Sequence, residues 1–554
     1  MLKDKIRFSL KKILKNLKIL KKNSPNWKKI ISSNKKIYEE LKIKSRNGQK
    51  ILICTSAGGH LLASQFEALM ALGLTRYGAN VEIMLCDKAL KACHMTTSNF
   101  IDEDTLLNKG QKKLCNSCLD SGKESFEELG LKINYYSNFI SNTEEQKILN
   151  QIDKMDFKEM KKFCEDEVPV GEHAYAGILR YYAVGTLDKE KNAKKIFKKF
   201  ITSALITKKV FFNFFSINKF EKIVLNHAIY VPQGIICDIA KLFKIKIIAY
   251  ATAYKKNSFI YSYDDTYHRT MMDEDTKDWE NIDFDQNKEK ILFEYLNSRK
   301  YGSQDMFYYF KNPSFEIESQ LKGIGVDLSK PIIGILPNII WDAQLEYKNN
   351  IFENMVDWII NTLKYLAHRK DIQVVVRSHP GEVYADRVSK QLVKEVIRET
   401  FNEIPKNLKI IDADSDISSY SFANYCNTLI IYATKMGIEF SPFGNRIICA
   451  GESYIKNKGI TLDPNSKEEY YNLLNKLPNI QKPSVQNIER AKKYAYHYFF
   501  RRTFQIESLD STPQKWPPFK INEMALDKII NNNDNGLKAV CDCIINNKKF
   551  IQDI

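Results

Sequence analysis

The sequence lacks two motifs that would assign a cofactor or a catalytic metal. A glycine turn, Ala57-Gly-Gly-His60, follows an apolar run, but no G-x-G-x-x-G fingerprint is present, so we expect no dinucleotide such as NAD. No D-x-D motif stands near a strand end in the position of a metal-dependent sugar-donor site. The nearest case, Asp412-Ala-Asp414, is interpreted as a loop. We therefore predict no catalytic metal.

Long apolar runs and a dispersed basic charge are also missing. No run approaches the roughly 18 residues of a membrane-spanning helix, and no signal peptide opens the sequence. We therefore expect a cytoplasmic protein. The net charge of +17 is concentrated at the start, where residues 1–50 hold 17 Lys and Arg against three acidic residues. Nucleic-acid binders more often spread their charge over a folded face, so we predict no nucleic-acid partner.

Residues 1–48 are predicted to form a basic helical arm. Its apolar residues recur at helical spacing, with lysines on the other faces: Ile6, Leu10, Ile13, Leu14 and Leu17. This pattern is typical of an amphipathic helix on an anionic membrane surface. A solvated helix that docks on the body of the protein has the same pattern. The first alternative makes residues 1–45 a peripheral anchor on the inner face of the cell membrane.

Four of the eleven cysteines are spaced like metal ligands. Cys86, Cys93, Cys115 and Cys118 follow the pattern C-x6-C-x21-C-x2-C, and its closing C-x2-C is typical of tetrahedral thiolate sites. The first gap is wider than usual, and His94 could replace one ligand. The pattern favours a structural zinc site, with an iron–sulfur cluster or four unligated thiols as alternatives.

Polar side chains follow three predicted strands in the C-terminal half. The run Ile430–Tyr432 ends at Thr434 and Lys435, and a helix is expected to start there with its N–H groups free for an anion. The strand 446–450 ends at Gly451, and the strand 374–377 ends at Arg377 and His379. Open α/β sheets bind ligands at such ends. The spacing therefore predicts a diphosphate ligand, such as a nucleotide sugar.

The order of apolar runs predicts an α/β fold with two Rossmann-like domains facing a cleft, the arrangement called GT-B. Strands are expected over 50–56, 81–87, 223–230 and 246–251, and then over 331–337, 373–377, 408–412, 428–432 and 446–450. The predicted parts are the arm 1–48, an acceptor domain 49–275 that contains the cysteines, a helical linker 276–325, a nucleotide-sugar domain 326–485 and C-terminal helices 486–554.

Several segments resemble bacterial capsule or surface-polysaccharide biosynthesis proteins, a family related to capsule Kdo transferases. The similar segments span residues 50–505: Thr434-Lys-Met-Gly-Ile-Glu439, Ala450-Gly-Glu452, Asn457-Lys-Gly-Ile-Thr461, Arg377-Ser-His-Pro-Gly-Glu382, Asn338-Ile-Ile-Trp-Asp-Ala343, His227-Ala-Ile-Tyr-Val-Pro232 and Asp265-Thr-Tyr-His268. The resemblance implies that His379 lies against the donor phosphate. Lys435 departs from the family, in which a Ser-Thr pair is common, and could favour a diphosphate donor.

Each candidate has a structural alternative. Arg377 could clamp a phosphate or form an interdomain salt bridge, and His379 could donate to the leaving phosphate or cap its turn. Glu439 could hold ribose hydroxyls or complement a helix N-terminus. Two further donor-side groups, Glu452 and Lys456, could simply be solvated. The general base is assigned to His60 or Asp342, with catalytic roles for these two and for His379.

The predicted function is glycosyl transfer from a nucleotide-sugar donor to a glycan or lipid-linked acceptor of a surface polysaccharide. Two alternatives stay open. The same fold could be a nucleotide-sugar epimerase or hydrolase, or a non-catalytic scaffold for polysaccharide assembly or export.

Overall fold

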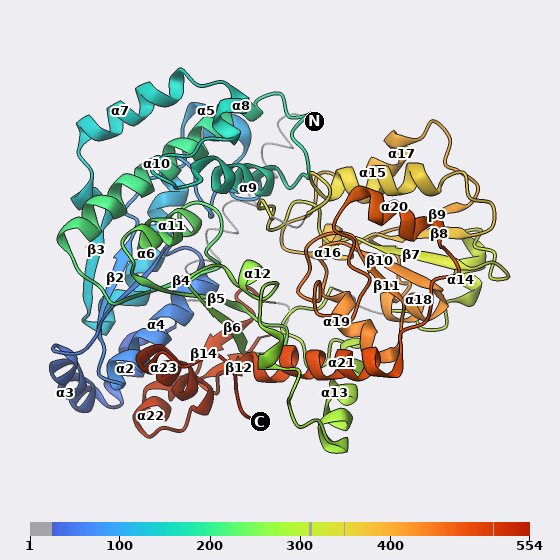
Figure 1. Ribbon diagram of the computed structural model, residues 1–554. Coiled ribbons are helices and arrows are strands. Elements are labelled where there is room, and N and C mark those ends of the chain that lie inside the picture. Colours follow the sequence, from blue (N-terminus) through green and yellow to red (C-terminus); the bar gives the residue numbers. More distant parts are fainter. Residues whose placement is uncertain (1–24, 310–312, 348–349, 513–514) are drawn as a thin grey trace. The chain divides into compact units, whose positions relative to one another are not determined.

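The computed structural model describes residues 25–309, 313–347, 350–512 and 515–554. The chain divides into two compact units (Figure 1). Unit 1 comprises Met1–Tyr182, Asp188–Tyr267 and Arg502–Ile554, and unit 2 comprises Ala183–Leu187 and His268–Arg501. The segment 276–325, predicted as a linker, therefore lies inside unit 2, and the C-terminal segment is shared between the units.

The sheet of unit 1 has the strand order of a Rossmann fold. Its seven strands run in the order β12-β6-β5-β4-β1-β2-β3, with these bounds: β1 (Lys50–Ser56), β2 (Asn80–Leu85), β3 (Lys132–Tyr135), β4 (Lys222–Asn226), β5 (Lys246–Thr252), β6 (Ser258–Tyr263) and β12 (Thr503–Gln505). β1 to β5 are parallel in the doubly wound order 3-2-1-4-5, and β6 and β12 add antiparallel strands at one edge. The switch point lies between β1 and β4.

Helices flank both faces of this sheet (Figure 1). They are α2 (Trp27–Ser32), α3 (Lys35–Ser45), α4 (Leu61–Arg76), α5 (Glu103–Asn108), α6 (Lys112–Phe126), α7 (Asn142–Asp153), α8 (Phe157–Lys161), α9 (Val170–Tyr182), α10 (Ala193–Ile217), α11 (Gln233–Leu242), α22 (Ala525–Ile530) and α23 (Asn535–Asn546). Among the described residues, α10 alone is long and apolar enough to cross a membrane, but 72% of its apolar window is buried and it packs on α9 and α11. It is therefore a core helix of unit 1.

Unit 2 repeats the doubly wound order. Its five parallel strands run β11-β10-β7-β8-β9, with the bounds β7 (Ile332–Leu336), β8 (Gln373–Arg377), β9 (Leu408–Ile411), β10 (Thr428–Ile431) and β11 (Ile447–Cys449). β7 to β9 and β10 to β11 are again in the order 3-2-1-4-5, and the switch point lies between β7 and β10. The α/β class with two Rossmann-like units is therefore as the sequence predicts.

The helices of unit 2 bury the faces of its sheet. They are α12 (Tyr267–Thr270), α13 (Gln286–Arg299), α14 (Glu318–Gly323), α15 (Met355–Leu366), α16 (Gly381–Tyr384), α17 (Val393–Thr400), α18 (Ser419–Tyr425), α19 (Met436–Phe440), α20 (Lys467–Asn475) and α21 (Val485–Tyr496). Trp358 and Ile359 of α15 pack with Val374, Ile430 and Tyr470 in one core. The strands are apolar throughout because helices cover them on both faces.

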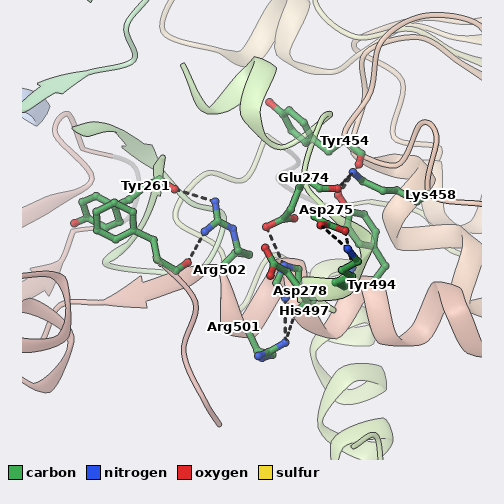
Figure 2. Close-up of polar contacts among 12 residues, drawn as sticks. Tyr261, Glu274, Asp275, Asp278, Tyr454, Lys458, Tyr494, His497, Arg501 and Arg502 are labelled. Atoms are coloured by element: carbon green, nitrogen blue, oxygen red, sulfur yellow. Dashed lines mark hydrogen bonds and ion pairs between the residues drawn. The ribbon is translucent and has the colours of Figure 1, made fainter. Parts of the chain in front are cut away.

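The C-terminal chain passes from unit 2 to unit 1 between two adjacent arginines, each fixed within its own unit (Figure 2). Arg501 donates to the carbonyl of Asp278 at 2.8 Å, in unit 2. Arg502 donates to the carbonyls of Tyr261, at 3.0 Å, and Phe550 in unit 1. Residues 502–554 then add β12 and a hairpin of β13 (Leu509–Ser511) and β14 (Phe519–Ile521). The predicted all-helical C-terminus is thus wrong for residues 503–521, where these three strands lie between α21 and α22.

The described part of the N-terminal arm is docked on unit 1. Trp27, Ile30 and Tyr38 of α2 and α3 are buried, and the Tyr38 hydroxyl donates to the carbonyl of Leu129 at 3.0 Å. Residues 26–45 of the arm are therefore docked on unit 1. The predicted amphipathic stripe, Ile6 to Leu17, lies outside the described residues, so its membrane-bound and docked alternatives both stay predictions.

Candidate functional site

The carboxyl ends of β7 and β10 meet at the switch point of unit 2, where doubly wound sheets bind ligands. Asn338, after β7, donates through its side-chain amide to the carbonyl of Ala433, after β10, at 3.0 Å. Ala433 has a left-handed φ of 49°, which a residue with a Cβ adopts at a cost. The backbone of the turn before Thr434 and Lys435 is therefore strained. The hydrogen bond from Asn338, which follows the neighbouring strand β7, holds this turn in place.

His379 has a fixed tautomer in the turn after β8. Its Nδ1 accepts the backbone N–H of Gly381 at 3.0 Å, so in the neutral ring the proton lies on Nε2. Burial and the charges of Lys435 and Arg377 lower the pKa of His379 to about 3, opposed by Asp342. The side chain is half-buried. His379 is therefore a neutral hydrogen-bond donor at physiological pH.

Lys435 lies beside a buried ion network. Burial and the charge of Arg299 lower the pKa of Lys435 to about 7, opposed by the carboxylates of Glu439 and Asp305. Arg299 pairs with Asp305 at 2.8 Å and with Glu439 at 3.2 Å. Glu439 also accepts the hydroxyl of Tyr420 at 2.5 Å. The Glu439 carboxylate is thus held by protein groups, which gives it a structural role in place of the predicted ribose contact.

Arg377 does not present a guanidinium fork to a ligand. Its side chain is buried, Nη1 donates to the carbonyls of Ser378 and Asp412, and Nη2 donates to the carbonyl of Ser415. Both terminal nitrogens hold the loop after β9 (Leu408–Ile411). The predicted phosphate clamp and its interdomain salt-bridge alternative are both replaced by this role within unit 2.

The other predicted donor-side residues follow β10 and β11. Thr434 accepts the N–H of Met436 at 3.4 Å and, through its carbonyl, the hydroxyl of Ser453 at 2.9 Å. A Cβ at Gly451 would lie 2.6 Å from the Tyr432 ring, so this glycine is required by packing.

Glu452 and Lys456 are both buried. The Glu452 N–H donates to Asn350 Oδ1, and the Lys456 ammonium donates to the carbonyl of Pro464. The solvated alternative for these two is therefore wrong.

The helix expected after Lys435 is short. α19 has five residues and continues into a 3-10 turn, Ser441–Phe443. Asp342 lies on the exposed loop after β7, and its negative charge acts on His379. His379, Lys435 and Asp342 thus follow the neighbouring parallel strands β8, β10 and β7, at the same edge of the unit 2 sheet.

A second polar cluster lies at the switch point of unit 1. His60 precedes α4, and its ring centroid is 4.6 Å from that of His94 and 6.4 Å from that of Trp516. Arg180 donates to the His94 carbonyl at 2.6 Å and lies over the ring of Tyr230. β4 ends at Asn226, four residues before the end predicted from the apolar run.

The segment after β4 has left-handed backbone at three residues with side chains: His227, Ala228 and Tyr230, with φ of 61°, 56° and 68°. Such conformations are costly and are found most often at functional sites. The sequence-based interpretation placed this segment in a strand and included it among the segments that resemble the capsule family, without assigning a role to Tyr230. Arg180 was not assigned either, and His94 was considered only as an alternative metal ligand.

Arg299, Asp305 and Tyr420 were also missed as site residues. Arg299 and Asp305 lie in the stretch predicted as a charged linker. There the sequence pattern does not distinguish a charged residue that forms a buried ion pair from one that is solvated. One feature of the sequence could have indicated that Arg299 is buried. Tyr295 in α13 lies four residues before Arg299, and residues at that spacing share one face of a helix. The Tyr295 hydroxyl accepts from Arg299 at 2.8 Å.

No protein-family model matches this sequence, and no curated protein matches it. The chain is similar in structure to the β-Kdo 2,4 transferase KpsC of Thermosulfurimonas dismutans, with 9% identity, coverage of 56% of this chain and 87% of that chain, and a TM-score of 0.33. It is similar to MnaA of S. aureus in a co-structure with UDP (9% identity, 90% and 97% covered, TM-score 0.28). It is also similar to the spinosyn rhamnosyltransferase SpnG (8% identity, 87% and 100% covered, TM-score 0.25). Two Kdo transferases are thus among the solved structures to which the chain is similar.

Proposed function

We propose that the protein is a glycosyltransferase that moves a sugar from a nucleotide-sugar donor to a glycan or lipid-linked acceptor of a surface polysaccharide. The observation that supports this most directly is the position of His379 and Lys435 after neighbouring strands at the carboxyl edge of the unit 2 sheet. One is a neutral donor with a fixed tautomer, and the other is a half-buried lysine whose pKa burial lowers to about 7. An anion beside them would restore the charged form of Lys435.

The proposed reaction places charge where these groups can stabilise it. The acceptor hydroxyl oxygen forms a bond to the anomeric carbon, and the bond from that carbon to the donor phosphate oxygen breaks with its electron pair on the oxygen. Lys435 and the Nε2–H of His379 stabilise the departing phosphate. Asp342, exposed on the loop after β7 (Ile332–Leu336), takes the proton of the hydroxyl.

A ligand-stabilisation screen tests the proposal. The melting temperature of the full chain is measured with CMP, UDP, GDP and dTDP and with their sugar conjugates. A nucleotide present at 100 times its Kd adds about 2.7 kcal/mol to the stability of the form that binds it, which corresponds to a shift of roughly 5 °C or more for a unit of this size. We expect one nucleotide class to give this shift, and the shift to be smaller in His379→Ala, which removes one hydrogen-bond donor to the phosphate.

The same screen separates the alternative functions. Consumption of the sugar conjugate without any acceptor would identify an epimerase or hydrolase. No shift with any nucleotide would contradict a donor site and favour the scaffold alternative.

Nucleotide binding should weaken as the pH rises above 7. The folded-state pKa of Lys435 is depressed to about 7, so free protein loses this positive charge above that pH, whereas bound phosphate raises the pKa again. Binding then takes up one proton, and the affinity should fall by up to tenfold per pH unit between about pH 7.5 and 9. Calorimetric titration at several pH values measures this, and Lys435→Gln should flatten the profile. An unchanged affinity over this range would contradict a role for Lys435.

We also propose a cytoplasmic, peripheral membrane location, with residues 1–24 as the part of the arm that contacts anionic lipid. Because α2 (Trp27–Ser32) and α3 (Lys35–Ser45) are docked on unit 1, deletion of residues 2–24 should release the protein from vesicles that contain anionic lipid. Retention on those vesicles would contradict the anchor.

A further inference from the structure

The four cysteines singled out by their spacing converge on one cavity in unit 1. Cys86 follows β2 (Asn80–Leu85), Cys93 lies in the loop beyond it, and Cys115 and Cys118 lie one turn apart on α6. All four line one cavity of about 20 Å³. Cysteines from a strand end, a loop and a helix are thus gathered around one small space.

Hydrogen-bond donors surround the sulfur atoms. The N–H of Gly59 donates to Cys118 Sγ at 3.1 Å, and the Thr96 hydroxyl lies 3.8 Å from Cys93 Sγ. The backbone N–H groups of Lys88, Ala89 and Leu90 are directed at the sulfur of Cys86 as hydrogen-bond donors. Such donors stabilise thiolate sulfur, and they surround the ligands of metal–thiolate sites.

The four sulfur-bearing side chains line the same cavity, and without a cation four thiolates there would repel one another. A divalent cation reverses this repulsion, because it binds the deprotonated form.

The glycine turn after β1 (Lys50–Ser56) packs against the cysteine helix. A Cβ at Gly58 would lie 2.5 Å from Gly122 Cα and 2.7 Å from the Cys118 carbonyl oxygen, and one at Gly59 would lie 3.1 Å from Cys118 Cβ. The two glycines thus allow α6 to approach the turn closely. The cysteine-bearing helix therefore packs directly on the turn between β1 and α4.

We propose that Cys86, Cys93, Cys115 and Cys118 bind a structural Zn²⁺ ion. Within the described residues no three His, Cys, Asp or Glu side chains already stand in metal-binding geometry, so the thiols must rotate into the cavity as they deprotonate.

A cavity with room for about one water-sized sphere suits a single ion rather than an eight-atom iron–sulfur cluster. Bound zinc would tie the Cys93–His94 loop to the Gly59–His60 turn and so hold the two histidine rings in place. This inference does not depend on the proposed transferase activity.

Metal analysis of the untagged full chain tests the site. We expect close to one zinc per chain, retained through gel filtration in a weak chelator, and loss of this zinc in Cys115→Ser/Cys118→Ser. The control is Cys541→Ser/Cys543→Ser, which changes two buried cysteines of α23 (Asn535–Asn546) and should retain zinc. Circular dichroism reports whether each variant folds.

Two further measurements do not need a folded serine variant. Exchange of zinc for Co²⁺ in the natural sequence should give the intense visible absorption of a tetrahedral thiolate site. In Cys118→His, a substitution that retains a zinc ligand, zinc should be kept. Natural protein without zinc, in which the four thiols react with a thiol reagent in the native state, would overturn the proposal. Iron with acid-labile sulfide in place of zinc would overturn it too.

Discussion

Arg299→Leu should destabilise unit 2 by about 3–5 kcal/mol, because it leaves two buried carboxylates without their cation. Arg299 is 3% exposed and pairs with Asp305 at 2.8 Å and with Glu439 at 3.2 Å, and these carboxylate side chains are 5% and 1% exposed. Their pairing with Arg299 is therefore almost wholly shielded from water. Urea unfolding followed by circular dichroism measures the loss as a lower transition midpoint at an unchanged slope.

A surface pair in the same unit provides the matched control. Lys322 and Glu318 form an ion pair at 2.6 Å, but both side chains are more than half exposed. Lys322→Leu should change stability by less than about 1 kcal/mol. Arg299→Lys should fall between the two, because a lysine does not reproduce the planar fork that reaches both carboxylates. Equal losses in Arg299→Leu and Lys322→Leu would contradict the buried network.

Arg299→Leu has a second expected effect, on binding. The charge of Arg299 is one cause of the lowered Lys435 pKa, so its removal should raise that pKa. The pH at which nucleotide affinity begins to fall should then move upward. This readout separates an electrostatic effect on the ligand site from a general loss of stability.

The two Rossmann-like units could be predicted because their strands are short apolar runs. Ile332–Leu336 and Thr428–Ile431 are buried along their whole lengths, and such strands are recognised without knowledge of their neighbours. The strands β3, β6 and β12 were not predicted. β3 is partly exposed, and β12 (Thr503–Gln505) is only three residues long and pairs with a strand some 240 residues earlier.

The roles of individual side chains were less predictable than the strands that position them. His379 and Lys435 could be placed at the edge of a sheet because each directly follows an apolar run. The partners of Arg377 and Glu439 are a loop carbonyl at Asp412 and the guanidinium of Arg299. Neither is adjacent in sequence, so a pattern of residues along the chain does not reveal whether a charge is already paired.

Substitution of His379 by alanine should lower kcat for glycosyl transfer by roughly 10²- to 10³-fold, the usual effect of removing one preorganised donor to a developing negative charge. Gly381 fixes the ring with its proton on Nε2, and the lowered pKa keeps the ring neutral at pH 7. Since the bond to the leaving phosphate strengthens as charge develops, kcat should fall more than KM rises. Steady-state rates with the nucleotide sugar identified by the screen measure this split.

Two variants show whether the donor atom of His379 is what matters. His379→Gln offers an amide N–H near the position of Nε2–H and should recover part of the lost rate, with no new ionisable group. His368→Ala changes an exposed histidine at the far end of α15 (Met355–Leu366) and should leave the rate unchanged. If His379→Ala lowered the melting temperature and the rate together and His379→Gln recovered neither, the ring would be a structural cap of the turn before Pro380. If His379→Gln recovered the rate but was no more stable than His379→Ala, the result would instead show that His379 acts on the leaving phosphate.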